Sequence, residues 1–461
     1  MLSPASIERI LTAALSCGGD FSEVYIERSK VSSVSLLNGV VENTGSSNDC
    51  GIGIRVLEGD KCVYVYSNDL HNEEKLIRMA KNASASLKKV EGGRTVYLTP
   101  MISYCSNPFE IAPTSVSKSL KVDKLRQASN VAKNYSEEIT QTSASCADVE
   151  RHILIANSDG LQIEDNRCRC RLTISAIATS GNEKQNGSFG PGSGRGYEFV
   201  EKYDLDEKAR EAARIATVML KAKPCPSGKM PVVLGNGFGG VIFHEACGHA
   251  LESTFVGIGT SYFTGKKDQQ IASPIVTAYD DARIEHEWGS YLVDDEGTPS
   301  TTNLLIENGV LKNYLIDKIG GRRMGVDSTG CARRQNYSYA PVARMSNTFI
   351  AAGESDPKDI IADTEYGLYA ANLGGGSVDT ATGEFNFAVN EAYMIRDGKI
   401  CEPVKGATMV GKGNEVLMHI DRVGNDLELS QGVCGADSGN IPVDVGQPTI
   451  RVSEISVGGQ A

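Results

Sequence analysis

The chain has 461 residues, of which 40% are hydrophobic and 23% charged. This composition is typical of folded globular proteins, so a disordered, collagen-like or membrane-spanning protein is not expected. Acidic residues outnumber basic residues by 58 to 46, which gives a net charge of −12 and argues against general nucleic-acid binding.

The first 222 residues contain helices and groups of strands in an order that repeats once. Pro4, directly after the capping residue Ser3, predicts a first helix that ends at Gly18. Alternating apolar residues then predict strands near residues 22–30, 32–42, 51–58 and 61–67. A second helix is predicted over residues 72–90, before a pair of glycines.

The same order of elements follows in the second part of this region. A helix is predicted over residues 117–136, and another over residues 206–221. Between them, strands are predicted near residues 140–149, 151–157 and 160–180.

Residues 223–229, Lys-Pro-Cys-Pro-Ser-Gly-Lys, have the composition of a linker and predict the main domain boundary. In the C-terminal part, a helix is predicted near residues 239–253 and hairpin turns at 307–309 and 396–398. The fold class is therefore expected to be α+β, with a β-rich C-terminal domain that carries the helix. The expected domains are an N-terminal α+β domain (1–110), a central α+β domain (111–222) and the C-terminal domain (229–461).

Twelve cysteines are scattered along the chain without a CxxC pair, which is not the pattern of a small disulfide-rich scaffold. Glu8 and Arg9 interrupt the first apolar residues, so these do not resemble a secretory signal. We therefore expect reduced thiols and a cytoplasmic location.

The clearest chemical signal is the run His244-Glu245-Ala246-Cys247-Gly248-His249, which holds two of only six histidines. Two histidines beside a glutamate are typical of catalytic metal sites. Here the histidines are five residues apart, and a regular helix leaves them about 140° out of phase. We expect both to bind one ion only if the helix has a wider turn, which Gly248 would ease; otherwise they are ordinary partly buried histidines.

Neutral imidazoles suit zinc, and Glu245 is placed to act as a general base on the attacking water. A catalytic zinc usually has three protein ligands and an open fourth position. The spacing leaves the third ligand open, with Glu252, Cys247, Glu285, His286 and any C-terminal cysteine as candidates.

The same segment contains a competing motif. Gly235 to Gly240 fits G-x-G-x-x-G after an apolar strand and before a helix, as in a dinucleotide-binding turn. The strand with an acidic end that should follow about 20 residues later is missing, and the nearest, Ile275 to Asp280, lies about twice as far along. We interpret these glycines as positions of close backbone packing, with a nucleotide-dependent enzyme as an alternative.

Several segments of the chain resemble the TldD/PmbA family of microbial metallopeptidases, and specifically its TldD members. These segments are HEACGHALE at 244–252, RMSNT at 344–348, DTATGEF at 379–385, GVCG at 432–435 and VGQPT at 445–449. Their order and spacing hold across nearly all of residues 229–461, whereas residues 1–222 match only in the order of helices and strands.

The resemblance implies one zinc ion per chain, held by His244, His249 and Cys434, with Glu245 activating water. A soft thiolate with two imidazoles suits zinc. Cys247 stands where an apolar residue is expected, and we interpret it as a small buried thiol.

The resemblance further implies a zinc-dependent peptidase whose unfolded or flexible peptide substrates bind in an extended form. It also implies a homodimer, or a heterodimer with a metal-free PmbA/TldE-like paralogue. The net negative charge and the lack of a long apolar run lead us to expect no nucleic-acid or membrane partner. The alternative function is a non-catalytic regulatory or binding subunit with a structural zinc. The oxyanion-stabilising residue stays open, as does the question whether Arg344, Asp379 and Glu384 line the substrate path or fix the strands.

Overall fold

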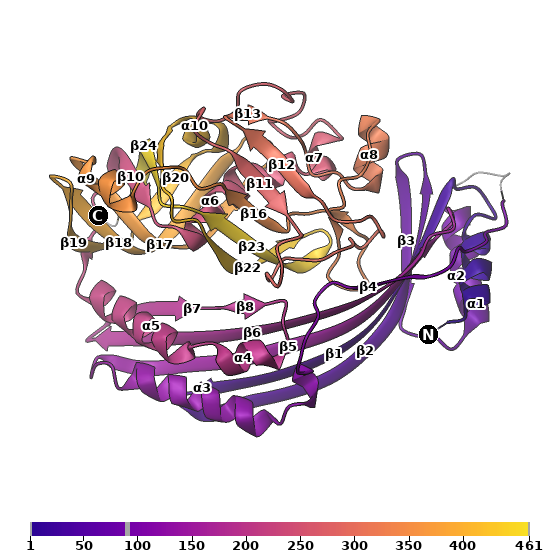
Figure 1. Cartoon of the computed structure of the whole chain (residues 1–461), viewed down its shortest axis with the longest axis horizontal. Coiled ribbons are helices and arrows are strands. Elements are labelled where there is room, and N and C mark those ends of the chain that lie inside the picture. The colour runs from indigo at the N-terminus through magenta and orange to yellow at the C-terminus, as the bar shows by residue number, and fades with distance from the viewer. Residues whose placement is uncertain (1, 88–92, 460–461) are drawn as a thin grey trace.

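The longest feature of the computed structural model, which describes residues 2–87 and 93–459, is a curved sheet of long strands (Figure 1). Its strands, in their order of pairing, are β3 (Lys61–Ser67), β2 (Val40–Glu58), β1 (Phe21–Leu37), β5 (Ile139–Asn157), β6 (Gln162–Ser180) and β4 (Ile102–Cys105), with β7 (Glu183–Phe189) and β8 (Gly192–Ser193) beside β6. Strands from both sides of residue 110 therefore share one sheet.

The central strands of this sheet are longer than the sequence pattern predicts. β1 is one strand of 17 residues where the pattern indicates two. Its first seven residues are all buried, residues 28–31 are largely exposed, and alternate burial resumes at Ser32. The periodicity therefore changes within the strand, although the backbone pairing with β2 and β5 continues.

Two groups of helices pack on opposite ends of these long strands. α1 (Pro4–Ala14) and α2 (Glu73–Ala85) cover the end that contains Val24 and Ile54. α3 (Lys118–Lys133) and α5 (Leu205–Leu220) cover the end that contains Val34 and Leu172, with the short α4 (Tyr197–Lys202) and η1 (Pro113–Ser115) nearby. The four predicted helices are confirmed, and positions 88–90 of the second prediction lie outside the described residues.

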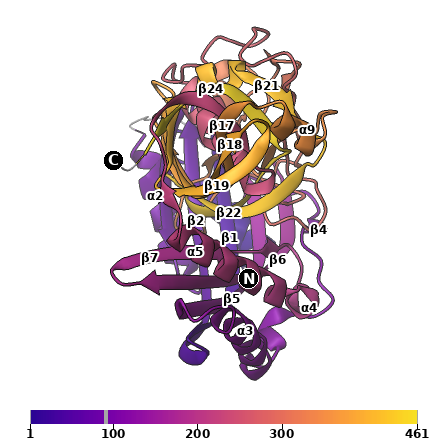
Figure 2. The ribbon, with the colours of Figure 1, turned by 90° about the vertical axis from the view of Figure 1, so that its left-hand side faces the viewer.

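The remaining strands form two larger sheets and one pair, which lie over the concave side of the curved sheet (Figures 1 and 2). The first sheet contains, in order, β17 (Tyr366–Val378), β10 (Gly228–Leu234), β24 (Ile450–Gly458), β20 (Thr408–Lys412), β18 (Glu384–Arg396), β19 (Lys399–Lys405) and β9 (Lys223–Pro224), with β21 (Ile420–Val423) beside β24. The second contains β13 (Val310–Leu311), β12 (Thr302–Glu307), β11 (Ala278–Asp281), β16 (Asn347–Ile350), β23 (Gly439–Gln447) and β22 (Glu428–Ala436), and β14 (Ala332–Arg333) pairs with β15 (Val342–Ala343).

Short helical segments connect these strands. They are η2 (Gly237–Gly240), α6 (Val241–Phe243), η3 (His244–Gly248), η4 (His249–Leu251), α7 (Ser253–Val256), α8 (Lys318–Met324), α9 (Pro357–Ala362) and α10 (Gly413–Met418). The helix predicted near 239–253 is thus a helical run over 237–251 whose pitch changes along its length. The α+β class with a β-rich C-terminal part is confirmed.

The predicted hairpin turns are also present. Asn308 and Gly309 connect β12 to β13, and Asp397 and Gly398 connect β18 to β19, all four with positive φ. Within residues 2–87 and 93–459, no helix is both long and apolar enough to cross a membrane.

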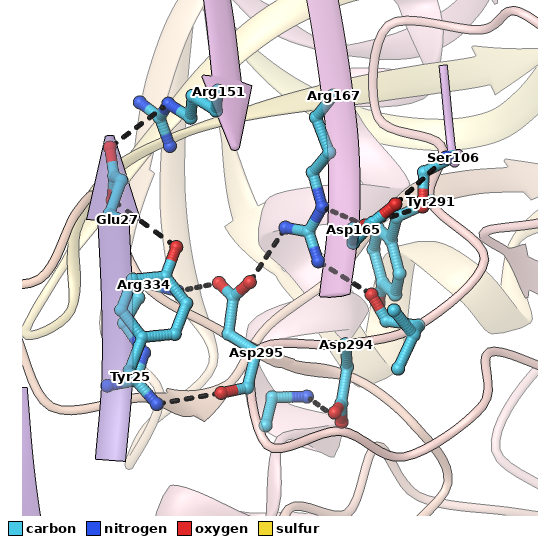
Figure 3. A network of polar contacts seen from close by, with 12 residues as sticks. Tyr25, Glu27, Ser106, Arg151, Asp165, Arg167, Tyr291, Asp294, Asp295 and Arg334 are labelled. Atoms are coloured by element: carbon cyan, nitrogen blue, oxygen red, sulfur yellow. Dashed lines mark hydrogen bonds and ion pairs between the residues drawn. The ribbon is translucent and has the colours of Figure 1, made fainter. Parts of the chain in front are cut away.

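A buried network of charged residues joins the curved sheet to the C-terminal part (Figure 3). Arg167 on β6 lies between Asp165 and Asp295, with N···O distances of 2.7 Å to both, and it also donates to the carbonyl of Val293. Buried charges are tolerated only when they are paired and hydrogen-bonded. This network therefore fixes the curved sheet against residues 293–295.

Two more arginines extend the same network along the sheet. Arg55 on β2 pairs with Glu23 on β1 at 2.9 Å and with Glu296 at 2.6 Å. Arg334 donates to Glu23 at 2.9 Å and to the carbonyl of Asp295 at 2.7 Å. All of these side chains are nearly inaccessible to solvent.

We predict that Arg167→Met lowers the free energy of unfolding by about 3–5 kcal/mol, because it leaves two carboxylates buried without their cation. Urea unfolding followed by circular dichroism measures this change. Arg78→Met is the matched control: its pair with Glu74 is solvent-exposed, so we expect a change below about 1 kcal/mol. Equal midpoints for the two variants would contradict the role assigned to the network.

Candidate metal centre

The helical run that carries the two histidines begins in unusually close contact with a neighbouring strand. It follows β10, and a Cβ atom added at Gly240 would lie 2.5 Å from backbone atoms of Gly446 on β23. At Gly239 a Cβ atom would lie 2.5 Å from the side chain of Gln447. The interpretation of these glycines as close-packing positions is confirmed.

The wider turn expected from the five-residue spacing is present as η3, a single π-helical turn. The backbone N–H of His249 donates to the carbonyl of His244, which closes an i→i+5 turn. The two imidazole rings consequently lie on the same side, with centroids 4.9 Å apart and planes at 86°. The Tyr262 hydroxyl donates to the carbonyl of Ala246 within this turn, a contact that no sequence spacing indicates.

Gly248 contributes to the turn in a way different from the one expected. Its φ of −53° and ψ of −53° are ordinary right-handed helical values, so the turn does not need the conformational freedom of glycine. A Cβ atom at this position would lie 2.1 Å from the sulfur of Met345. Glycine therefore leaves room for the side chain of Met345, which packs against the turn from another segment.

Cys434 on β22 is brought to both histidines although it lies 185 residues beyond His249 in the sequence. Its sulfur is 3.3 Å from Nε2 of His244 and 3.2 Å from Nε2 of His249. All three side chains are buried, and their ligand atoms lie within 4.8 Å of one another. The structure thus brings together the three ligands that the family resemblance implies.

The chemistry of this donor set fits a zinc ion. Two imidazole nitrogens and one thiolate around a tetrahedral zinc would have N···S distances of about 3.6 Å, close to those in the structure. Glu252 accepts a hydrogen bond from Nδ1 of His249 at 3.1 Å, so Nε2 of that ring is free to bind a metal. Glu252, a candidate third ligand from spacing, is therefore bonded to His249 and lies outside the group of three.

The charges of the site are set by the contacts between the thiol and the imidazoles. Burial opposes ionisation of Cys434, but the charge of His244 and hydrogen bonds from both histidines outweigh it and lower the thiol pKa to about 3. Burial likewise opposes a charge on His249, but Glu252 and Cys434 raise the pKa of this imidazole well above its usual value. Without metal, the site holds a thiolate beside an imidazolium.

Glu245 lies next to this group on the partly open side of the turn. Its side chain is 18% exposed, and Oε2 is 3.8 Å from Nε2 of His249. Burial raises the pKa of the Glu245 carboxyl, while His244 and His249 lower it. A carboxylate with a raised pKa beside a metal site is suited to taking and returning a proton.

The other candidate ligands lie outside this group of three. Cys247 is fully buried, and burial raises the pKa of its thiol, which agrees with a small core residue. Glu285 is mostly exposed and pairs with His286 at 3.1 Å. The backbone carbonyl of His286 accepts hydrogen bonds from Gly194 and Ser193, so this segment contacts β8 and the residue that follows it.

Three residues of the other family-like segments, Arg344, Asp379 and Glu384, make contacts within the C-terminal part of the chain. Arg344 is fully buried and donates to the backbone of the β22–β23 hairpin. Asp379 accepts hydrogen bonds from the backbone N–H groups of Ala381 and Thr382, and so closes an exposed turn. Glu384 is exposed and lies 4.0 Å from Lys412.

A cavity of about 1020 Å³ lies beside β22, the strand that carries Cys434, and between that strand, α5 and β17. Residues 428–431 of β22 line one side, and residues 371–375 of β17 line another. Gly374 and Gly375 lie in an irregular part of the β17–β18 pairing and have no register partner on β18. β22 is the edge strand of its sheet, so the cavity lies along a strand with only one neighbouring strand in that sheet among the described residues.

Models of three protein-family domains match successive parts of the chain. They are described as PmbA/TldA metallopeptidase domain 1 (residues 22–87), central domain (residues 111–220) and C-terminal domain (residues 227–459). Two solved structures share the fold. One, from Thermotoga maritima and described as a candidate modulator of a DNA gyrase, has a TM-score of 0.78 at 22% identity and covers 95% of this chain and 96% of that one.

The second structure, TldE from Thermococcus kodakarensis, has a TM-score of 0.75 at 20% identity, with 96% and 97% of the two chains covered. Curated relatives are more similar in sequence. The metalloprotease TldD homolog of Haemophilus influenzae is 38% identical, over 95% of this chain and 93% of the relative. A metalloprotease of Methanocaldococcus jannaschii is 33% identical over 98% and 99% of the two chains. With matches along nearly its whole length and the metal motif in place, this chain belongs to the PmbA/TldD family of metallopeptidases.

Proposed function

We propose that this chain is a zinc-dependent peptidase that hydrolyses unfolded or flexible peptides, with Glu245 as the general base. The observation that carries this proposal is the convergence of two imidazole nitrogens and one thiolate on a single point, with Glu245 beside them. His244, His249 and Cys434 would hold one zinc ion and leave a fourth position open. A zinc ion there would supply Lewis-acid polarisation of the scissile carbonyl and of the attacking water.

The residues of the chain account for the proton transfers. Glu245 takes a proton from the attacking water and later returns it to the leaving amine, which suits a carboxyl group whose burial raises its pKa. Glu252 holds His249 through Nδ1 and so fixes the direction of Nε2.

The cavity beside β22 supports an extended peptide as the substrate. β22 is the edge strand of its sheet, so main-chain groups on its outer side have no partner strand in that sheet among the described residues. Its residues 428–431 line the cavity together with Gly374 and Gly375, which have no register partner on β18. An extended chain satisfies such main-chain groups by adding as a strand, which a compact folded protein cannot do. Binding in this cavity would therefore favour substrates with unfolded or flexible segments over folded proteins.

We further propose that the chain works in the cytoplasm as a dimer, either with a second copy or with a metal-free PmbA/TldE-like chain. All twelve cysteines are free thiols, as expected in a reducing compartment. The similarity of the fold to TldE supports a partner built on the same architecture. Activity is therefore to be measured both for this chain alone and in the presence of such a partner.

We predict that Glu245→Gln keeps its zinc and lowers kcat by about 10²–10⁴-fold, because the amide cannot accept the proton. The assay follows cleavage of a denatured, alkylated protein, with the folded form of the same protein as a poor substrate. Glu285→Gln is the matched control, because this exposed residue does not contact the three proposed ligands. Unchanged turnover in Glu245→Gln would refute the mechanism, and zinc-loaded wild type without turnover would favour a structural zinc.

We predict that Cys434→Ser loses most of its zinc on dialysis, because a neutral hydroxyl replaces the thiolate ligand. Metal content per chain is measured by atomic emission. Cys247→Ala is the control for loss of a buried thiol, and we expect it to keep one zinc per chain. Full zinc retention in Cys434→Ser would show that another residue completes the site.

Zinc binding is predicted to release about one proton from the His249–Cys434 pair at pH 7. Cys434, with a thiol pKa of about 3, is already ionised, whereas the raised pKa of His249 keeps that imidazole protonated in the metal-free protein. Zinc needs the neutral ring, so its apparent affinity rises with pH until this pKa is passed. Calorimetric titration in two buffers with different ionisation enthalpies counts the protons, and a count near zero would contradict this assignment.

A further inference from the structure

The proposed ligands come from two segments that are far apart in the chain and meet only through tertiary contacts. The histidines belong to the helical run after β10, and Cys434 belongs to the hairpin formed by β22 and β23. A metal site binds its ion more tightly when the ligands are already held within about 0.5 Å of the productive geometry. A residue that contacts both the helical run and the hairpin would hold the ligands in this geometry.

Arg344 contacts the hairpin through two of its guanidinium nitrogens. Nη2 donates to the backbone carbonyl of Cys434 at 2.8 Å. Nη1 donates to the hydroxyl of Ser438 at 3.0 Å and to the carbonyl of Gly439 at 3.1 Å. The planar guanidinium group therefore holds both strands of the hairpin at the end where the thiolate lies.

The third nitrogen of the same group faces the histidine side of the site. Nε of Arg344 is buried and lies 4.0 Å from Oε1 of Glu252, the carboxylate oxygen that accepts from Nδ1 of His249. Among the described residues this Nε has no hydrogen-bond partner. The buried side chain of Arg344 thus faces Glu252, which bonds to the ring of His249. The same side chain also donates to the backbone of Cys434.

The segment around Arg344 is itself fixed against the π-helical turn. The backbone N–H of Arg344 donates to the carbonyl of Cys331, and the next residue, Met345, packs against Gly248. The carbonyl of Met345 accepts a hydrogen bond from Arg333 at 2.7 Å. The backbone that carries the Arg344 side chain is therefore held in place between the helical run and the hairpin.

We propose that Arg344 is a positioning residue that holds Cys434 and, through Glu252, His249 in metal-binding geometry, and so sets the affinity of the centre for its ion. This inference rests on the proposed metal centre. A lysine would keep the charge but could not donate to both strands of the hairpin while facing Glu252, because its ammonium is a single point at the end of a flexible chain.

The test compares the zinc affinity of wild type, Arg344→Met, Arg344→Lys and Arg55→Met by chelator competition. The affinity of Arg344→Met is expected to fall by about 10–100-fold, as for other residues that orient metal ligands, with Arg344→Lys in between. Arg55→Met removes an equally buried arginine whose partners are Glu23 and Glu296, and we expect it to bind zinc as wild type does.

A second readout distinguishes positioning from a general loss of stability. When cobalt(II) replaces zinc, thiolate-to-cobalt charge-transfer absorption reports the geometry at Cys434, and we expect it to shift or weaken in both Arg344 variants and not in Arg55→Met. Wild-type affinity and spectrum in Arg344→Lys and Arg344→Met would overturn the inference, as would equal losses in Arg55→Met. If Arg344→Met does not fold, Arg344→Lys decides the question, and a wild type that binds no metal would instead overturn the proposed function.

Discussion

One hydrogen bond of unusual span, from the backbone N–H of His249 to the carbonyl of His244, determines what the rest of this structure can do. With ordinary helical hydrogen bonds the two rings would point about 140° apart and could not share an ion. A π-helical turn interrupts the regular hydrogen-bond pattern, and it persists only where the surroundings compensate. Here the hydroxyl of Tyr262 binds the carbonyl of Ala246, and Met345 packs where the turn has no side chain.

The second requirement is that a thiolate from a distant strand reaches the two rings. The close approach of Gly240 to Gly446 brings the start of the helical run against β23, and β23 pairs with the strand that carries Cys434. A buried thiolate is unfavourable alone, but it is stabilised by the neighbouring imidazoles, as the lowered pKa of Cys434 records. The site is therefore already charged and oriented for a divalent cation.

The curved sheet and its helices contact the C-terminal part of the chain at the buried arginines and at the cavity. Its buried arginines hold the segment of residues 293–296, and helix α5 forms one wall of the cavity whose other walls are β17 and β22. The cavity thus lies between parts of the chain that are distant in sequence, and the buried ion pairs join the same parts. The C-terminal part carries the candidate metal ligands, and the N-terminal part contributes one wall of the cavity.

The sequence alone determined the α+β class, the helix positions, the two hairpin turns and the need for a wider turn between His244 and His249, because these depend on local periodicity and spacing. It could not choose the third ligand from spacing, since nothing local connects Cys434 to the histidines; only the family resemblance named it. It divided β1 into two strands, because burial changes along a strand whose pairing does not. The tertiary structure alone placed Arg344 on the backbone of Cys434, because these residues lie in segments that only folding brings together. It also decided that Glu252, although close to His249 in sequence, bonds to Nδ1 of that ring, because spacing does not fix the direction of a side chain.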